Sequence, residues 1–343
     1  MAHVLTEVLI CNNGKSVTMK TKLFHPLLAV TLLFLPFITL AQGGKDFLQP
    51  FNLKNIQTMN ELEYPFTVNK VSLPSGPEIA YVDEGKGDYT VIFIHGLGSY
   101  LPAWTKNIEG LKSFCRCIAI DLPGYGKSSK QPHSGKMSYY ASVVNEFIET
   151  LGLENVVLAG HSMGGQISMV AALNYPDRIK KLVLVAPAGF EKFSEGQKQW
   201  FRNVMTLDGV KKTTAEDIQT NLAVNFYNMP ADAEFMITDR LIMRSAGDFD
   251  HYCYAVVQSV NGMVDEPVLE LLPQIKQPTL ILFGKYDNLI PNRFLNPGKT
   301  EKIARDGHRL IPGSQLLMID KAGHFVMFEK AQEVNKAVID FLR

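Results

Sequence analysis

A single serine lies where an apolar, strand-like run ends and a helix-compatible run begins. The run Val156–Gly160 is apolar, Ser162 follows it after one residue, and glycines stand two positions before and two positions after the serine, at Gly160 and Gly164. Glycines at these positions allow a strand and a helix to approach closely while the serine oxygen projects outward. The spacing therefore predicts a serine nucleophile on a sharp connection between a strand and a helix.

Apolar runs and helical patterns alternate on both sides of this serine. Besides the run before Ser162, strands are predicted at residues 67–73, 78–84, 90–95, 116–121, 179–186, 279–284 and 316–320, and helices at 105–113, 138–151, 163–174 and 331–343. Ser138 is the predicted N-cap of its helix. The first two strands form a hairpin, and later strands alternate with helices. This pattern predicts an α/β fold with a parallel sheet covered on both faces and an antiparallel edge.

The predicted strands are interrupted by one long helical segment. Residues 188–273 contain helix-like patterns without a strand of comparable strength, which predicts a helical lid inserted between two sheet strands. The predicted organisation is therefore an N-terminal arm at 42–66, a core at 67–187 and 274–343, and a lid at 188–273. The connection from Pro291 to Ser314 is long and is expected to form an extra loop near the site.

Several further motifs follow the predicted strands in a fixed order. They are His95–Gly98, Asp121–Ser128, the serine turn, Gly284–Asp287 with Ile290–Pro291, and Ala322–His324. Together they make residues 67–343 resemble the alpha/beta-hydrolase fold superfamily, and in particular its lid-bearing serine hydrolases. The resemblance implies a mostly parallel central sheet covered by helices on both faces, with a helical lid inserted between two strands.

The resemblance assigns Ser162, Asp287 and His324 to a catalytic triad, in the chain order that this superfamily uses. A serine hydroxyl is a weak nucleophile at neutral pH and needs a neighbouring base, here His324. The Asp287 carboxylate would hold the imidazole in the right tautomer and stabilise its protonated form. Both residues follow predicted strands, so they are expected at the carboxyl edge of the sheet. Glu191 and Asp320 are alternative acids.

The negatively charged oxygen that forms during attack on a carbonyl group needs hydrogen-bond donors. By resemblance, the backbone N–H groups of Leu97 and Met163 form this oxyanion hole. His95 and His161 are interpreted as residues that shape their loops. Asp121, in a turn rich in glycine, is interpreted as a structural residue and not as a second acid.

The serine narrows the expected chemistry. Relatives that open epoxides or displace halide have aspartate at this position, so Ser162 disfavours those reactions. Relatives with serine include carboxylesterases, lipases, lactonases, carbon–carbon bond hydrolases, aminopeptidases and cofactor-free perhydrolases. The expectation is hydrolysis of an ester or related acyl bond in a small-molecule substrate. A non-catalytic binding protein on the same fold is the alternative from a different functional class.

The N-terminal region has the pattern of a secretory signal. Residues 19–22 carry two lysines, residues 23–40 are mainly apolar, and small residues lead to Ala41. The stretch Leu27–Leu40 is shorter than the roughly 20 residues that a membrane-spanning helix needs. The pattern predicts translation from Met19, a signal peptide that ends at Ala41, and a periplasmic or extracellular protein. Without cleavage, the segment would anchor the protein in the membrane.

Composition excludes several kinds of partner. Lys and Arg together number 34, as do Asp and Glu, so the charge balance predicts no nucleic-acid binding. The sequence lacks G-x-G-x-x-G and H-E-x-x-H, and Asp121 occupies the place of a glycine that a phosphate loop would need before Gly126. No cofactor or metal is therefore predicted. Cys115, Cys117 and Cys253 are expected to be buried free thiols, and no feature specifies an oligomeric state.

Overall fold

The structure is a computed structural model that describes residues 9–12, 15–18 and 53–343. The predicted signal peptide, with its cleavage point at Ala41, lies outside the described residues. Two short strands, β1 (Leu9–Asn12) and β2 (Lys15–Thr18), pair in antiparallel fashion. Within the described ranges, no helix combines the length and the apolar character that crossing a membrane requires.

The other strands form one eight-stranded sheet in the order β10-β9-β8-β7-β5-β6-β4-β3. Their bounds are β3 (Asn69–Ser72), β4 (Glu78–Glu84), β5 (Thr90–Ile94), β6 (Arg116–Ile120), β7 (Val156–His161), β8 (Ile179–Val185), β9 (Thr279–Gly284) and β10 (Gln315–Ile319). The β3–β4 and β4–β6 pairs are antiparallel, and every other pair is parallel. The predicted, mostly parallel sheet with an antiparallel edge is confirmed.

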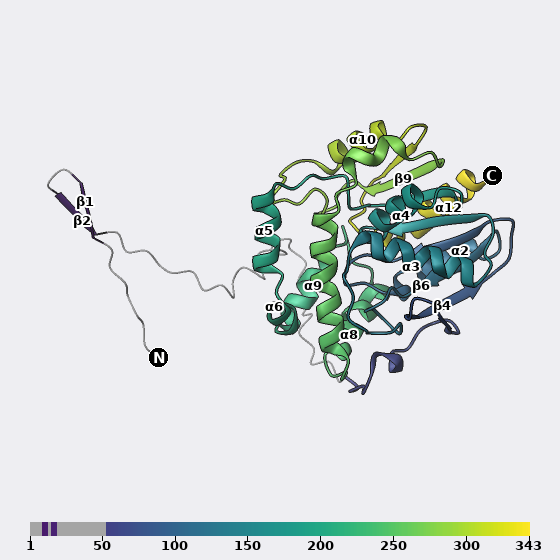
Figure 1. Cartoon of the computed structure of the whole chain (residues 1–343), viewed down its shortest axis with the longest axis horizontal. Coiled ribbons are helices and arrows are strands. Elements are labelled where there is room, and N and C mark those ends of the chain that lie inside the picture. Colours follow the sequence, from purple (N-terminus) through teal and green to yellow (C-terminus); the bar gives the residue numbers. More distant parts are fainter. Residues whose placement is uncertain (1–8, 13–14, 19–52) are drawn as a thin grey trace.

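Helices cover both faces of this sheet (Figure 1). They are α2 (Thr105–Leu111), α3 (Met137–Thr150), α4 (Met163–Asn174), α10 (Thr300–Leu310), α11 (Val326–Glu329) and α12 (Ala331–Leu342). Strand side chains alternate between the two faces. Ile92 and Ile94 belong to the core under α3 and α4, whereas Val91 and Phe93 belong to the core under α2 and α12. All four are buried, as expected for a strand covered on both faces.

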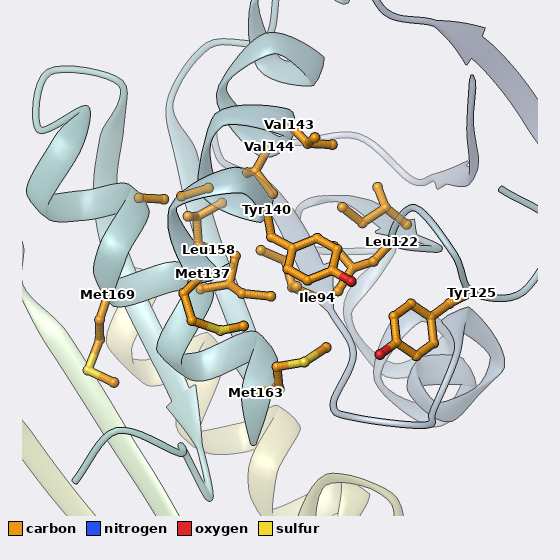
Figure 2. Close-up of a cluster of buried hydrophobic side chains, with 14 of the residues drawn as sticks. Ile94, Leu122, Tyr125, Met137, Tyr140, Val143, Val144, Leu158, Met163 and Met169 are labelled. Atoms are coloured by element: carbon orange, nitrogen blue, oxygen red, sulfur yellow. The ribbon is translucent and has the colours of Figure 1, made fainter. Parts of the chain in front are cut away.

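The cluster between α3 and the central strands shows how the sheet is held against its helices. Met137, Tyr140 and Val144 of α3 gather around Ile94 of β5 and Leu158 of β7 (Figure 2). All five residues are fully buried. Each fully buried aliphatic or aromatic side chain stabilises the folded state by roughly 1.5–3 kcal/mol. This packing therefore fixes the strands that lead to the serine turn.

The segment between β8 and β9 is helical, as predicted. This insertion, residues 186–278, contains α5 (Glu195–Val204), α6 (Leu207–Lys211), α7 (Ala215–Ala223), α8 (Glu234–Met243) and α9 (Phe249–Asp265), with short 3-10 turns at Ala231–Ala233 and Leu269–Gln274. Helices α5, α6, α8 and α9 stand together beside the sheet (Figure 1). The residues before β3 pack on the insertion, because Met59 N–H donates to Asp248 (3.1 Å) and Gly247 N–H donates to the Gln57 carbonyl (2.8 Å).

Two local predictions are wrong. Ser138 is not an N-cap, because α3 begins at Met137 and Ser138 instead donates its N–H and hydroxyl to the Glu266 carboxylate of the insertion (both 2.8 Å). The connection from Pro291 to Ser314 is not all loop, because most of its second half is α10. Helix α10 has a charged face and a narrow buried face, on which Ala304 is fully buried and Gly307 packs against Phe190.

The three cysteines within residues 53–343 are buried and free, as predicted. The Sγ atoms of Cys115 and Cys117 lie 3.7 Å apart on β6 and its preceding residue. They therefore share one face of the strand without forming a bridge.

The crossing of β5 and α4 generates a stability prediction. A Cβ atom on Gly164 would lie 2.2 Å from the Ile94 carbonyl oxygen, which is backbone and cannot move aside. We expect Gly164→Ala to lower the free energy of unfolding by about 2 kcal/mol or more in urea titrations. Gly196→Ala is the matched control, because Gly196 lies in α5 with no atom within 4 Å of its added Cβ. The control should be neutral or stabilising by up to about 1 kcal/mol; equal losses in both variants would contradict the packing argument.

Candidate active site

Ser162 occupies the tight turn between β7 and α4. Its φ of 53° and ψ of −118° are rare for a residue with a side chain, so the turn is strained and must be held by its surroundings. Its N–H donates to the Val185 carbonyl (3.0 Å), and its carbonyl accepts the N–H groups of Gly165 and Ala188 (both 2.9 Å). These bonds to β8, α4 and the start of the insertion hold the serine at the carboxyl edge of the sheet.

Asp287 and His324 lie in direct contact, as the sequence predicts. His324 Nδ1 donates to Asp287 Oδ2 (2.7 Å), and the two side chains are 4% and 0% exposed. Asp287 Oδ1 accepts the N–H groups of Leu289 (2.8 Å) and Ile290 (3.0 Å). A carboxylate that accepts three donors keeps its orientation, and the contact places the imidazole proton on Nδ1. His324 Nε2 is therefore left with a lone pair that can accept a proton.

Asp287 and His324 lie side by side because β9 and β10, the strands that precede them, are neighbours in the sheet. Beyond the strand ends, Lys285 N–H donates to the Ile319 carbonyl and Tyr286 N–H donates to the Ala322 carbonyl (both 2.9 Å). A Cβ atom on Gly284 would lie 2.2 Å from the Gly323 carbonyl oxygen. Glycine is therefore needed at 284 for the two loops to approach this closely.

His161 connects the serine turn to the base. Its Nε2 donates to the His324 carbonyl (3.1 Å), and the two rings lie 4.7 Å apart. Burial, reinforced by the neighbouring His324, lowers the pKa of His161 well below its ordinary value, so its ring is neutral. Among the described residues no hydrogen bond joins Ser162 Oγ to His324, which is common before a substrate is bound.

The predicted oxyanion donors lie beside the serine. A Cβ atom on Gly96 would stand 3.0 Å from Ser162 Cβ, so the 95–98 loop runs directly past the nucleophile. Within residues 53–343, the Leu97 N–H donates to no protein acceptor. Met163 is the first residue of α4, where N–H groups have no partner inside the helix. Both N–H groups are thus available to a negatively charged oxygen.

Two residues of the insertion hold the end of the 95–98 loop. The Gly98 carbonyl accepts the Tyr252 hydroxyl (3.3 Å) and contacts the Arg240 guanidinium. Arg240 also lies over the Tyr252 ring, 5.1 Å from its centroid. Gly98 has φ of 65°, which turns this carbonyl toward the insertion. No local signal in the sequence links Gly98 to helices α8 and α9, more than 130 residues later.

Asp121 has the structural role that the sequence suggests. Its carboxylate accepts the Tyr64 hydroxyl and the N–H groups of Leu101 and Lys127, each at 2.7 Å. The ammonium group of Lys130 donates to three carbonyls of the same turn, those of Tyr125, Gly126 and Ser128. Burial lowers the pKa of Lys130 to about 8. The Asp121 carboxylate and the Lys130 ammonium group therefore hold this turn in place through hydrogen bonds.

The two alternative acids lie away from the base. The Glu191 carboxylate accepts the Asn292 N–H (2.8 Å) and the Asn296 side-chain amide (3.2 Å), and burial raises its pKa. Asp320 pairs with Lys285 at the surface (3.4 Å). Neither carboxylate contacts His324, so of the three candidate acids only Asp287 lies against the imidazole.

Comparison with known proteins agrees with this geometry. Residues 89–331 match the family model described as alpha/beta hydrolase fold. The chain belongs to this family. It is 27% identical over 283 residues to a 2-hydroxy-6-oxononadienedioate/2-hydroxy-6-oxononatrienedioate hydrolase of Paraburkholderia phymatum. The aligned region covers 79% of this chain and 93% of that relative.

Two solved structures, of an esterase and of a probable hydrolytic enzyme, superimpose on most of the chain. An esterase of Thermogutta terrifontis aligns with a TM-score of 0.65 at 27% identity, over 81% of this chain and 98% of the esterase. A probable hydrolytic enzyme of Pseudomonas aeruginosa PAO1 aligns with a TM-score of 0.76 at 23% identity, over 84% and 99% of the two chains. The second likeness supports the fold alone.

Three histidines of this alpha/beta hydrolase, His95 and His161 in the interior and His133 partly buried, should make its stability depend on pH. Burial lowers the pKa of His95, His133 and His161 below the ordinary value of 6.5. Below pH 6.5 the unfolded chain therefore binds more protons than the folded chain. We expect the free energy of unfolding to be retained above this pH and to fall as the pH drops toward 5.5, by up to about 1.4 kcal/mol per pH unit for each histidine.

Urea titrations between pH 5.5 and 7.5 measure this dependence. His161→Asn removes one of the three groups, so its stability should decline less steeply between pH 6.5 and 5.5 than that of the natural chain. Parallel declines in the two proteins would contradict a neutral, buried His161.

Proposed function

We propose that this protein is a serine hydrolase that cleaves a carboxylic ester or a related acyl bond through an acyl-enzyme. The observation that carries the proposal is the buried contact between His324 Nδ1 and Asp287 Oδ2 (2.7 Å), beside a strained serine turn. A base with a fixed tautomer, a projecting serine and two free N–H groups are the parts that acyl transfer requires.

In the proposed reaction Ser162 Oγ attacks the substrate carbonyl carbon and gives its proton to His324 Nε2. The N–H groups of Leu97 and Met163 stabilise the resulting oxyanion. When the tetrahedral intermediate collapses, the bond to the leaving group breaks and His324 protonates that group. Water then gives a proton to His324, attacks the acyl group on Ser162 and releases the carboxylic acid, and the proton returns to Ser162.

Carbon–carbon bond hydrolysis is the second candidate reaction. It is favoured by the relative from Paraburkholderia phymatum, whose name describes a hydrolase of a keto-substituted dicarboxylate and which this chain matches over 93% of its length. The same nucleophile, base and donors could act on a ketone carbonyl. Esters, a lactone and a 2-hydroxy-6-oxo dienoate, tested side by side, would rank these reactions by kcat/KM.

We propose further that the insertion forms a lid that shapes the substrate site, and that the protein is exported. The lid proposal is supported by the contacts of Arg240 and Tyr252 with Gly98, because they bring the insertion against the 95–98 loop beside Ser162. The lysines, apolar run and small residues before Gln42 support the export proposal. N-terminal sequencing of the exported protein should then begin near Gln42; an intact Met19 in a cytosolic fraction would contradict export.

The nucleophile can be tested by covalent labelling and turnover. A fluorophosphonate probe should label the natural chain but not Ser162→Ala, and mass spectrometry should place the adduct on Ser162. Hydrolysis of p-nitrophenyl acetate and butyrate should fall to background in the variant. Equal turnover by the two proteins would refute the assignment of Ser162, and absence of both labelling and turnover would favour a binding protein on this fold.

Asp287→Asn tests the orienting acid. The amide can present its NH2 group to His324 Nδ1, which favours a proton on Nε2 and removes the base from Ser162. We expect kcat for p-nitrophenyl butyrate to fall by about 10³–10⁴-fold with little change in KM. Asp320→Asn is the control and should retain activity, since Asp320 lies at the surface away from His324. A larger loss in the control would transfer the role to Asp320.

A further inference from the structure

Glu329 joins two segments that are distant in the sequence. Its Oε2 accepts the N–H groups of Gly323 (2.8 Å) and Tyr227 (3.0 Å), and its Oε1 accepts the N–H of Asn228 (2.7 Å). Gly323 directly precedes His324, whereas the other two donors lie between α7 and α8 of the insertion. One carboxylate therefore ties the loop of the base to the insertion.

The same turn of the insertion also holds the other side of His324. The Phe325 N–H donates to the Asn225 carbonyl (2.9 Å), and the Phe325 ring stacks on Phe226 at 5.3 Å. A Cβ atom on Gly323 would lie 2.6 Å from the Asn225 carbonyl oxygen. The backbone on each side of the base is thus pressed against residues 225–228.

In the described part of the chain, the Glu329 carboxylate is held by backbone N–H groups alone. Among residues 53–343 it forms no ion pair within 4 Å, and its charge is balanced by three backbone dipoles. Hydrogen bonds to an ionised acceptor are shorter and stronger than those between neutral groups. Without this carboxylate, the Gly323 N–H and the two N–H groups of the insertion would lose their shared acceptor.

We propose that Glu329 is a positioning residue for the reaction: it holds the His324 backbone against residues 227–228, so that the imidazole stays within reach of Ser162. This inference rests on the proposed function. It also gives the insertion a second role, because the 225–228 turn would support the base as well as cover the substrate. Displacement of a catalytic group by about 1 Å can reduce a rate about 100-fold.

The test compares Glu329→Ala and Glu329→Gln with a control on the neighbouring helix. Glu333→Ala is that control, because Glu333 is an exposed acid on α12 for which the structure records no partner. In Glu329→Gln the amide oxygen can still accept two of the N–H groups, but the amide NH2 group would face the third. We therefore expect kcat to fall about 10–100-fold in Glu329→Ala and by a smaller factor in Glu329→Gln, with KM within about threefold. The control should stay within about twofold.

Rates must be expressed per competent site, so that loss of folded protein is not mistaken for loss of positioning. Active-site titration with a fluorophosphonate counts these sites, at a temperature well below the unfolding midpoint of each variant. If kcat per titrated site is unchanged in Glu329→Ala, Glu329 only stabilises the fold and the inference is wrong. A rise in KM with unchanged kcat would also overturn it.

A second readout does not depend on turnover. The proton that His324 Nδ1 shares with Asp287 should give a strongly downfield ¹H NMR signal, assigned by its loss in Asp287→Asn. We expect this signal to broaden or disappear in Glu329→Ala and to persist in Glu333→Ala. An unaltered signal in Glu329→Ala would overturn the inference, whether or not the natural chain is active. Failure of the natural chain to hydrolyse any of the substrates would instead refute the proposed function.

Discussion

Direct contact between backbone segments at the carboxyl edge of the sheet is the constraint on which this site depends. A Cβ atom on Gly160 would lie 2.2 Å from the Gly164 carbonyl oxygen, and one on Gly164 would lie 2.2 Å from that of Ile94. The same distance separates a Cβ atom on Gly284 from the Gly323 carbonyl oxygen. Side chains at these points would push apart the Ser162 turn, the 95–98 loop and the loop that holds His324. These segments can lie close together only because glycines stand where they touch.

The part of this arrangement that local sequence encodes could be predicted. A strand buried on both faces is a continuous apolar run, and β9 has the bounds expected for one. The partly buried strand β4 also has the predicted bounds. Helix α4 likewise begins and ends where its pattern predicts. The motifs after the strands predict the contact between Asp287 and His324, because neighbouring parallel strands deliver their following loops to one edge. The fold and the predicted site residues follow from such short-range signals.

Contacts that join distant segments could not be predicted in this way. The Ser138 pattern suggests a cap, but Glu266, 128 residues later, takes its donors. Five of the 11 residues of helix α10 are charged and only three are buried, so its sequence resembles a polar loop. The contacts of Glu329 with residues 227–228 likewise depend on how the insertion is placed on the core. Each depends on tertiary packing that periodicity does not report.

The hydrogen bond from Ala188 to the Ser162 carbonyl gives the insertion a fixed origin. Length changes farther along the insertion need not disturb the nucleophile, because its first residues are held at the turn itself. A shift of the chain at Ala188, in contrast, would act directly on the strained backbone of Ser162. Residues 225–228, Arg240 and Tyr252 return to the core farther along, where they contact the loops around His324 and Gly98. The insertion is thus free to change in length only in the stretches between its points of contact with the core.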